Sequence, residues 1–224
     1  MEFPDARLLI FAKAPIPGQV KTRLIPFLGA NGAAALHEQL ARRTLATAVN
    51  ARLCPVQLWC WPDPNHAFFK DCRERYCTDL YSQSGSGLGA RMAHACEQTL
   101  RQAPYVIIIG TDCPGLSRED LSTACTALAQ GHDAVIGPAE DGGYILLGLR
   151  TFAPILFDNM PWGSSGVLDA TRACFKQLRW RWRELPLQWD VDRPEDVERL
   201  LRDPAFDLDA ATLANEAPHK SEIP

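Results

Sequence analysis

The chain lacks several patterns that would direct it to other classes of protein. None of its eight cysteines has CxxC spacing or lies near a paired-histidine pattern, so a zinc site is not indicated. The formal net charge is −4, whereas nucleic-acid-binding domains usually carry a basic face. No apolar run approaches the roughly 20 residues that span a bilayer, and the N-terminus lacks the charged, apolar and small-residue order of a signal peptide. We therefore expect a cytoplasmic protein with reduced, structural cysteines that binds neither nucleic acid nor membrane.

What the chain does contain is enough apolar sequence for one large domain. Of its 224 residues, 46% are hydrophobic, and we expect one domain over residues 1–203 with a polar tail over residues 204–224. Short β-branched runs alternate with segments of helical spacing, which predicts an α/β fold with a mixed, mostly parallel sheet. Strands are expected at Leu8–Ala12, Pro55–Trp61, Tyr105–Ile109, Ala134–Ile136, Trp180–Leu185 and, as one antiparallel strand, Tyr144–Leu147. Helices are expected at Ala33–Val49, Ala67–Tyr76, Ala90–Arg101, Gly166–Leu178 and Pro194–Leu201, and between an N-cap at Ser117 and a stop at Gly131.

The most informative segment runs from Ile107 to Asp112. An apolar strand stops at Gly110, and Asp112 follows almost at once. Strands of a sheet covered on both faces read as continuous apolar runs, and ligands bind beyond their carboxyl ends. A carboxylate at that edge can hold Mg²⁺ against a substrate phosphate, although Asp is also a common turn or capping residue. The neighbouring Cys113 has no histidine nearby in sequence, and we interpret it as a packing residue.

The loop Ala14–Arg23 follows the first expected strand and therefore belongs at the same edge. Its prolines stiffen the backbone, Lys21 offers a compact charge, and Arg23 offers a fork that matches phosphate. A solvated loop with two ordinary cations is the alternative. The loop is neither a Walker A sequence nor a dinucleotide-binding GxGxxG.

The segment Asp190–Asp196 has two interpretations. With Glu195 three residues on and Pro194 near the first helical position, Asp192 fits a capping box, which the local pattern favours. A metal role would require its carboxylate to face Asp112 instead, with Asp190 as a second choice.

Three further segments carry weaker signals. Gln83–Gly89 is a glycine-rich loop at a helix start, which could present amides to an anion or a base but also suits a flexible connection. Pro138–Tyr144 has an acidic pair and two glycines, which suit a sugar hydroxyl, a cation, an acceptor amine or a plain turn. In Trp180–Arg183 the alternation favours packed Trp and solvated Arg side chains.

Together, and in this order, these segments resemble a bacterial glycosyltransferase-A-like family of largely undefined function, in which some members are named arsenosugar-biosynthesis glycosyltransferases. The family is similar to nucleotide-diphospho-sugar transferases and, more distantly, to phospholactate and molybdenum-cofactor guanylyltransferases. The resemblance spans Leu8 to Leu201 and rests on FAKAPIPGQVKTRL (Phe11–Leu24), GLGARM (Gly87–Met92), GTDCPGL (Gly110–Leu116), GPAEDGGYILLGL (Gly137–Leu149), MPWGSSGVLDAT (Met160–Thr171) and DVDRPEDVERL (Asp190–Leu200).

The resemblance implies a three-layer α/β/α sandwich with a nucleotide pocket at the strand ends. It implies Mg²⁺ (or Mn²⁺) held by Asp112 and Asp192, which replaces the capping interpretation of Asp192. Lys21 and Arg23 would bind phosphate and, with Asp112, form the catalytic set. The other implied contacts are Gln83, Gly87 and Leu88 for the nucleotide, and Asp141, Gly142, Gly143 and Tyr144 for the acceptor or sugar.

The chain also departs from the related patterns. The first loop lacks the Leu-x-Gly-Gly signature of sugar nucleotidyltransferases, and Asp112 is not followed by the second acid of an Asp-x-Asp pair. Arg193 stands where the family's DxDTPED segment has Thr. Asp112 therefore supports metal and phosphate chemistry more directly than it supports sugar transfer.

We expect a Mg²⁺-dependent enzyme that transfers a glycosyl group from a nucleotide-sugar to a small-molecule acceptor. The first alternative is a guanylyltransferase-like nucleotidyltransferase that uses a nucleoside triphosphate. The second is a non-catalytic nucleotide-binding protein.

Overall fold

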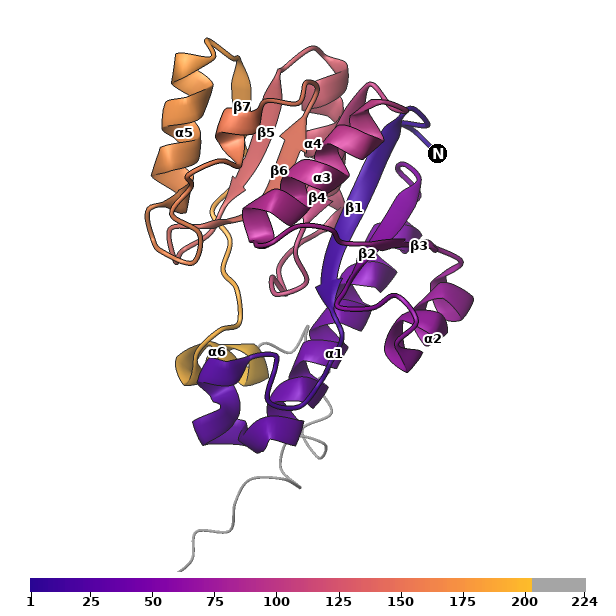
Figure 1. Ribbon diagram of the computed structural model, residues 1–224, viewed down its shortest axis with the longest axis vertical. Helices are drawn as coiled ribbons and strands as arrows, with labels where there is room; N and C mark the ends of the chain where they lie inside the picture. The colour runs from indigo at the N-terminus through magenta and orange to yellow at the C-terminus, as the bar shows by residue number, and fades with distance from the viewer. Residues whose placement is uncertain (203–224) are drawn as a thin grey trace, which may run out of the picture.

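A computed structural model describes residues 1–202 and shows a seven-stranded sheet covered by helices on both faces (Figure 1). The strand order is β3-β2-β1-β4-β6-β5-β7, and β6 runs antiparallel to both of its neighbours, β4 and β5. The single antiparallel strand and the mostly parallel sheet confirm the predicted fold class. The strands are β1 (Ala6–Lys13), β2 (Val56–Trp61), β3 (Asp79–Ser82), β4 (Tyr105–Ile109), β5 (Ala134–Pro138), β6 (Tyr144–Leu149) and β7 (Trp182–Glu184).

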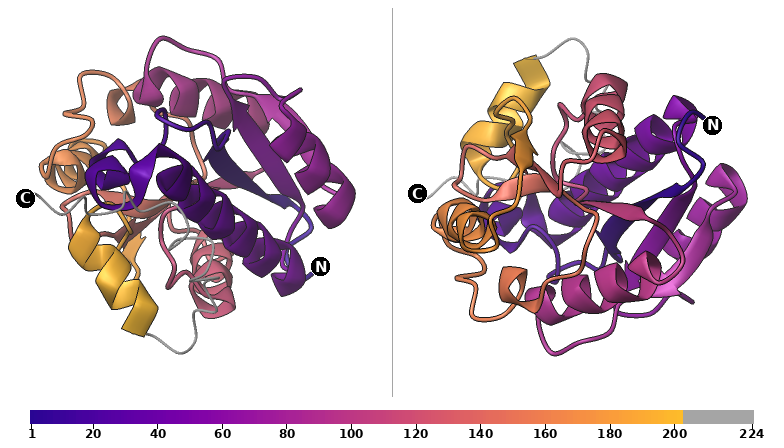
Figure 2. Two further views of the ribbon diagram at one scale, coloured as in Figure 1. Left: turned by 90° about the horizontal axis from the view of Figure 1, so that it is seen from below. Right: turned by 90° about the horizontal axis from the view of Figure 1, so that it is seen from above.

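Alternate residues of the central strands face opposite helical layers, as the period of a strand requires. Leu8 and Ile10 of β1 pack with α1, α2 and α4, whereas Leu9 packs with α3 and α5. Figure 2 shows the sheet between these layers, and the arrangement is the predicted α/β/α sandwich. The helices are α1 (Ile25–Ala51), α2 (Ala67–Tyr76), α3 (Leu88–Leu100), α4 (Arg118–Ala129), α5 (Val167–Gln177) and α6 (Pro194–Arg202), with short 3₁₀ turns η1 (Thr22–Leu24) and η2 (Pro154–Leu156).

A third apolar cluster joins the start of α1 to α6, two segments far apart in sequence. Leu28 and Leu36 of α1 pack there with Val197 and Leu200 of α6. In Figure 1 this pair of helices lies beyond the carboxyl end of β1. The cluster therefore holds the chain's last described helix against the edge of the sheet at which ligands were expected.

Two elements differ most from the sequence prediction. Helix α1 begins at Ile25 rather than Ala33, and Gly29 interrupts it with φ 71° and ψ 168°. Pro and Gly are unfavourable in a helix interior, and both occur near the start of α1. The local sequence therefore did not predict the first turns of this helix. Strand β3 was not predicted, because its four residues are too short to show an alternation.

Other expectations are confirmed. Strand β4 and helix α2 have the predicted bounds, and Ser117 and Asp120 form a reciprocal capping box at the start of α4. No helix within residues 1–202 is long and apolar enough to cross a membrane. The predicted tail over residues 204–224 lies outside the described residues.

Candidate active site

A cavity of about 560 Å³ opens at the carboxyl ends of β1 and β4. Its walls come from the loop after β1, the loop after β4, the start of α3, the start of β6 and the segment that leads into α6. A volume of this size is within the ordinary range for small-molecule sites. The structure thus brings together segments that are separated by most of the chain.

Lys21 joins three of these walls. Its backbone adopts the left-handed conformation, with φ 46° and ψ 42°, and its side chain is only 5% exposed. The ammonium donates a hydrogen bond to the Val191 carbonyl at 2.6 Å and forms an ion pair with Asp112. The backbone N–H of Val191 in turn donates to the Asp112 carbonyl at 3.0 Å. Lys21 is therefore held by both the β4 loop and the α6 linker.

Asp112 presents a carboxylate to the cavity, and its side chain is 47% exposed. Desolvation opposes its ionisation, but the Lys21 ammonium, with smaller contributions from His37 and Lys13, outweighs that effect and holds the pKa of Asp112 below its ordinary value. Asp112 is accordingly an anion at neutral pH. Cys113 beside it is buried, and burial raises the pKa of its thiol to about 11, which agrees with the predicted packing role.

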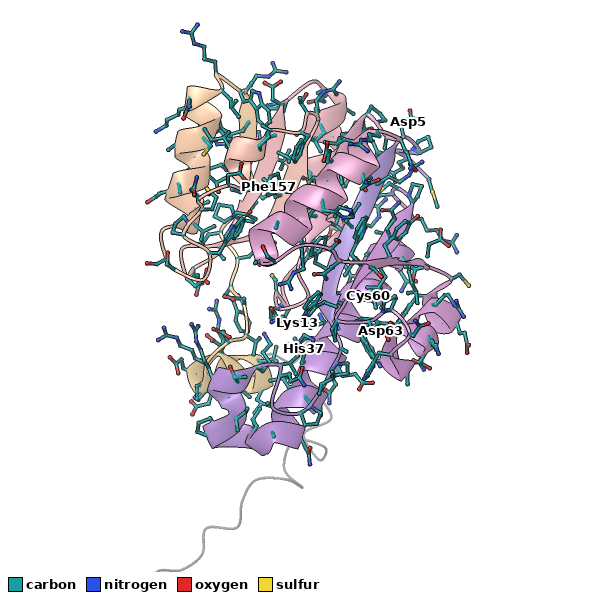
Figure 3. All side chains as sticks on the ribbon, in the orientation of Figure 1. Asp5, Lys13, His37, Cys60, Asp63 and Phe157 are labelled. Carbon is teal, nitrogen blue, oxygen red and sulfur yellow. The ribbon has the colours of Figure 1, made fainter. Side chains whose placement is uncertain are left out.

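His37 of α1 is a site residue that the sequence did not reveal. Its buried ring has Nε2 at 3.0 Å from the Lys13 carbonyl and Nδ1 at 3.9 Å from Asp112 Oδ1. Figure 3 shows Lys13 and His37 together at the end of β1. Burial lowers the pKa of His37, and the Lys13 carbonyl can only accept, so the neutral ring donates from Nε2. Nδ1 then carries no proton and makes no hydrogen bond to the Asp112 carboxylate. A lone His in an Ala- and Leu-rich helix carries no signal that separates this role from core packing.

Asp192 lines the cavity and forms an ion pair with Arg23. The local expectation that Asp192 caps α6 with Glu195 is wrong. Instead the Asp196 carboxylate accepts from the backbone N–H of Asp192 at 3.0 Å and of Arg193 at 2.7 Å. Because α6 begins at Pro194, the acid at the third helical position is Asp196, so the box is shifted by one residue. The Asp192 carboxylate is thereby left to face the cavity.

Asp190 also lines the cavity, and its carboxylate has no hydrogen bond or ion pair with another side chain of residues 1–202. Burial, together with the neighbouring carboxylates of Asp141 and Asp112, raises its pKa to about 6. The second-choice ligand of the sequence analysis is therefore the least compensated acid of the site.

The three predicted nucleotide contacts are placed differently from one another. Gln83 and Leu88 line the cavity, and Gly87 does not. The Gln83 amide donates to the carbonyls of Trp59 at 2.8 Å and Ala12 at 3.3 Å. Gln83 thus braces the ends of β1 and β2, and its amide orientation is set by the backbone.

In the predicted acceptor segment, Asp141, Gly143 and Tyr144 line the cavity. Gly142 does not line it; its backbone has a φ of 87° and lies against that of Ser165. The Tyr144 hydroxyl is buried and has no hydrogen-bond partner within residues 1–202. Its ring meets Trp162 edge-on with centroids 6.3 Å apart. Trp162 is a further lining residue that the sequence analysis did not select.

The Trp180–Arg183 segment and Arg193 lie away from the cavity. Trp180 and Trp182 pack on Phe175, with ring centroids 6.0 Å and 5.6 Å apart, while the intervening Arg181 is exposed. Arg193 is exposed and does not line the cavity. The predicted packing of the Trp side chains is confirmed.

Residues 1–202 contain no group of three or more His, Cys, Asp or Glu side chains arranged to hold a metal ion. The cavity instead offers separate carboxylates, of which Asp112 is paired with Lys21 and Asp192 with Arg23. Mg²⁺ is commonly bound by one or two carboxylates together with water and substrate phosphates. The chemistry of the donors suits such a site, whereas an all-protein metal cage is not formed by these residues.

A family profile and a solved structure both match this chain. A family profile described as "uncharacterized protein conserved in bacteria (DUF2064)" matches residues 44–164. A protein from Desulfovibrio desulfuricans G20, described provisionally as a nucleotide-diphospho-sugar transferase, is 31% identical with a TM-score of 0.81. That match covers 89% of this chain and 87% of the other. No curated protein sequence matches this one.

More distant structures share the fold alone. The 4-diphosphocytidyl-2C-methyl-D-erythritol synthase of Anaerococcus prevotii DSM 20548 is 12% identical with a TM-score of 0.58, and the match covers 88% of this chain and 94% of the other. A CMP:2-keto-3-deoxy-manno-octonic acid synthetase complexed with CTP is 12% identical with a TM-score of 0.56, covering 88% and 96%. The chain therefore has the fold of nucleotide-diphospho-sugar transferases and nucleotidyltransferases.

Proposed function

The chain belongs to the bacterial DUF2064 family, and we propose that it is a Mg²⁺-dependent transferase that moves a glycosyl group from a nucleotide-sugar to a small acceptor. The observation that carries the proposal is the buried Lys21 ammonium beside the half-exposed Asp112 carboxylate, inside a cavity at the strand ends. Such an edge is where open α/β sheets bind their ligands.

Asp112 would hold the cation together with Asp190 or Asp192. Asp190 is supported by the absence of a side-chain partner within residues 1–202 and by its pKa, which burial and the neighbouring carboxylates raise to about 6. Asp192 is supported by the family resemblance and by its place in the lining, although Arg23 neutralises it. A bound Mg²⁺ supplies Lewis-acid stabilisation of charge on phosphate oxygens.

The cations of the first loop would bind the phosphates of the donor. Lys21 is held rigidly by Val191 and Asp112, so little reorganisation is needed when charge develops on a leaving phosphate. Arg23 is 61% exposed and can rotate its fork toward a phosphate oxygen. Tyr144, with its unpaired buried hydroxyl, and Asp141 would contact the sugar or the acceptor.

Nucleotidyl transfer from a nucleoside triphosphate is the second candidate. Lys21 and Arg23 both lie in the loop after β1 and line the cavity, where two cations suit a triphosphate as well as a diphosphate. This observation favours nucleotidyl transfer as the second candidate. Glycosyl transfer releases a nucleoside diphosphate, whereas nucleotidyl transfer releases pyrophosphate, so the leaving group separates the two.

The experiment incubates the purified protein with Mg²⁺ and panels of nucleotide-sugars or nucleoside triphosphates, each with small hydroxyl and phosphate acceptors. Release of nucleoside diphosphate supports the proposal, and release of pyrophosphate supports the second candidate. Asp112→Asn should abolish either product, and the matched Asp158→Asn change on the exposed surface should not.

Nucleotide binding tests the non-catalytic alternative. If the protein binds a nucleotide with an affinity that is independent of Mg²⁺, and Asp112→Asn leaves that affinity unchanged, the metal-dependent transferase is wrong. Mg²⁺-linked binding that disappears in Asp112→Asn would support it.

A further inference from the structure

Four Lys and Arg side chains within residues 1–202 line the cavity, and they divide into two kinds. Lys21 and Arg23 are each neutralised by a carboxylate. Lys13 and Arg91 form no salt bridge with any described residue. The second pair is therefore the positive charge that the protein itself leaves uncompensated.

Arg91 is held in place without a hydrogen bond. Its guanidinium lies 4.4 Å from the centroid of the Trp61 ring, and its Nε is buried with no partner within residues 1–202. The strand register pairs Trp61 at the end of β2 with Lys13 at the end of β1. Lys13 and Arg91 therefore line the cavity on either side of Trp61, Lys13 as its neighbour in the strand register and Arg91 through its ring contact.

An Arg that is partly desolvated and has no counter-charge is costly unless a ligand compensates it. Cation–π contact with Trp fixes the guanidinium and covers one of its faces, while its N–H groups remain unused. A fixed guanidinium with unused donors suits bidentate contact with a phosphate or a carboxylate.

We propose that Arg91, stacked on the Trp61 ring, and Lys13 form a subsite for an anionic group, a phosphate or a carboxylate, on the acceptor. This inference rests on the proposed function, in which the Lys21–Arg23 loop holds the donor's phosphates. A second set of cations on another wall of the same cavity then serves the second substrate. The acceptor is accordingly a small molecule that carries a phosphate or a carboxylate.

The test measures the binding of inorganic phosphate to the whole protein by thermal shift and calorimetry, with EDTA present so that no metal contributes. Arg91→Gln should weaken phosphate binding at least about tenfold, the loss expected for one charge-assisted contact. Arg101→Gln is the matched control, because it removes the same charge from an exposed position just beyond α3. Lys13→Gln should weaken binding less, since Lys13 is exposed.

Equal phosphate affinity in Arg91→Gln and Arg101→Gln would overturn the proposal, as would wild-type protein that shows no phosphate binding. The melting temperature without phosphate shows whether Arg91→Gln is folded, and Arg91→Lys, which keeps the charge without the fork, gives a second variant. Replacing phosphate by malonate in the same titrations distinguishes a phosphate subsite from a carboxylate subsite, and either result supports the proposal.

A separate titration with nucleoside diphosphates and Mg²⁺ assigns the subsite to one substrate. If Arg91→Gln weakens phosphate binding and leaves nucleotide binding unchanged, the subsite belongs to the acceptor. If both fall by the same factor, Arg91 serves the donor and the acceptor assignment is wrong. If wild-type protein binds no nucleotide while phosphate still requires Arg91, the proposed function fails and the anion subsite remains.

Discussion

The two cationic walls of the cavity use opposite electrostatic arrangements. Near β4, Lys21 and Arg23 each contact a carboxylate, and Lys21 also donates to the Val191 carbonyl. At the β1–β2 edge, Arg91 stacks on the ring of Trp61, and its side chain forms no hydrogen bond or ion pair within residues 1–202. One wall is internally neutralised, whereas the other has no counter-charge within residues 1–202, which a ligand would supply under our proposal.

This difference in charge pairing indicates that the cations of the first wall contribute to the stability of the fold and that those of the second contribute to ligand binding. The buried Lys21 ties the β4 loop to the α6 linker, so its charge also stabilises the fold. The Arg91 side chain makes no hydrogen bond to another backbone segment within residues 1–202. Substitutions on the first wall should therefore change folding stability, whereas substitutions on the second should change ligand binding.

The largest expected effect is that of Lys21→Met, which keeps the volume of the side chain but leaves Asp112 and the Val191 carbonyl without their donor. We expect the free energy of unfolding to fall by about 2 kcal/mol, since a polar group left unsatisfied typically costs 1–3 kcal/mol. Denaturant unfolding measures the change. Lys70→Met, on the exposed face of α2, is the control and should stay within about 0.5 kcal/mol. Equal effects of the two changes would show that the Lys21 contacts add no net stability.

A smaller effect should follow from Asp190→Asn and should depend on pH. The pKa of Asp190 is raised from 3.8 to about 6 in the folded protein, so the folded state binds this proton more tightly than the unfolded state does. Its contribution to stability is full below about pH 4 and is lost as the pH rises through about 6. Relative to Asp190→Asn, the wild type should therefore lose about 1 kcal/mol between pH 4 and 7, after allowance for partial exposure.

Thermal unfolding across that pH range, with Asp158→Asn as the exposed control, measures this difference. A wild type that gains stability over Asp190→Asn as the pH rises would contradict the assigned pKa direction. Comparison at neutral pH with and without Mg²⁺ also shows whether the cation relieves the repulsion among the carboxylates.

The smallest effect should be that of the Arg23–Asp192 pair. Both side chains are substantially exposed, at 61% and 36%, so their coupling in a double-mutant cycle should be below about 1 kcal/mol. The cycle uses Arg23→Gln and Asp192→Asn in denaturant unfolding at low and high salt, and salt should reduce the coupling further. A larger coupling energy that does not depend on salt would show that Arg23, like Lys21, stabilises the fold.

Local patterns predicted most of the sheet and part of the site. Strand β4, helix α2 and the Ser117 cap depend on neighbouring residues, and each was placed correctly. The loops after β1 and β4 follow apolar strands, which was sufficient to assign Lys21 and Asp112 to one edge. Strand β3 and the start of α1 were missed because their sequences lack a periodic apolar signal.

The cap of α6 lies one residue away from its predicted position, which the sequence could not have shown. Asp192, Glu195 and Asp196 all suit a helix start, and one residue of register decides which carboxylate caps it. That register depends on where Pro194 enters the helix and on the packing of Val197 against α1. Sequence spacing alone therefore could not predict that Asp196 caps the helix and that the Asp192 carboxylate faces the cavity.

The sequence by itself determined the strand ends that carry Lys21 and Asp112, because strand periodicity and the edge rule are local properties. Only the tertiary structure decided how the charges pair. Lys21 meets Val191 across 170 positions of the chain, His37 reaches Asp112 from α1, and Arg91 settles on Trp61 rather than on a carboxylate. Pairing depends on distances of a few ångströms between side chains, and packing of the helices on the sheet sets those distances.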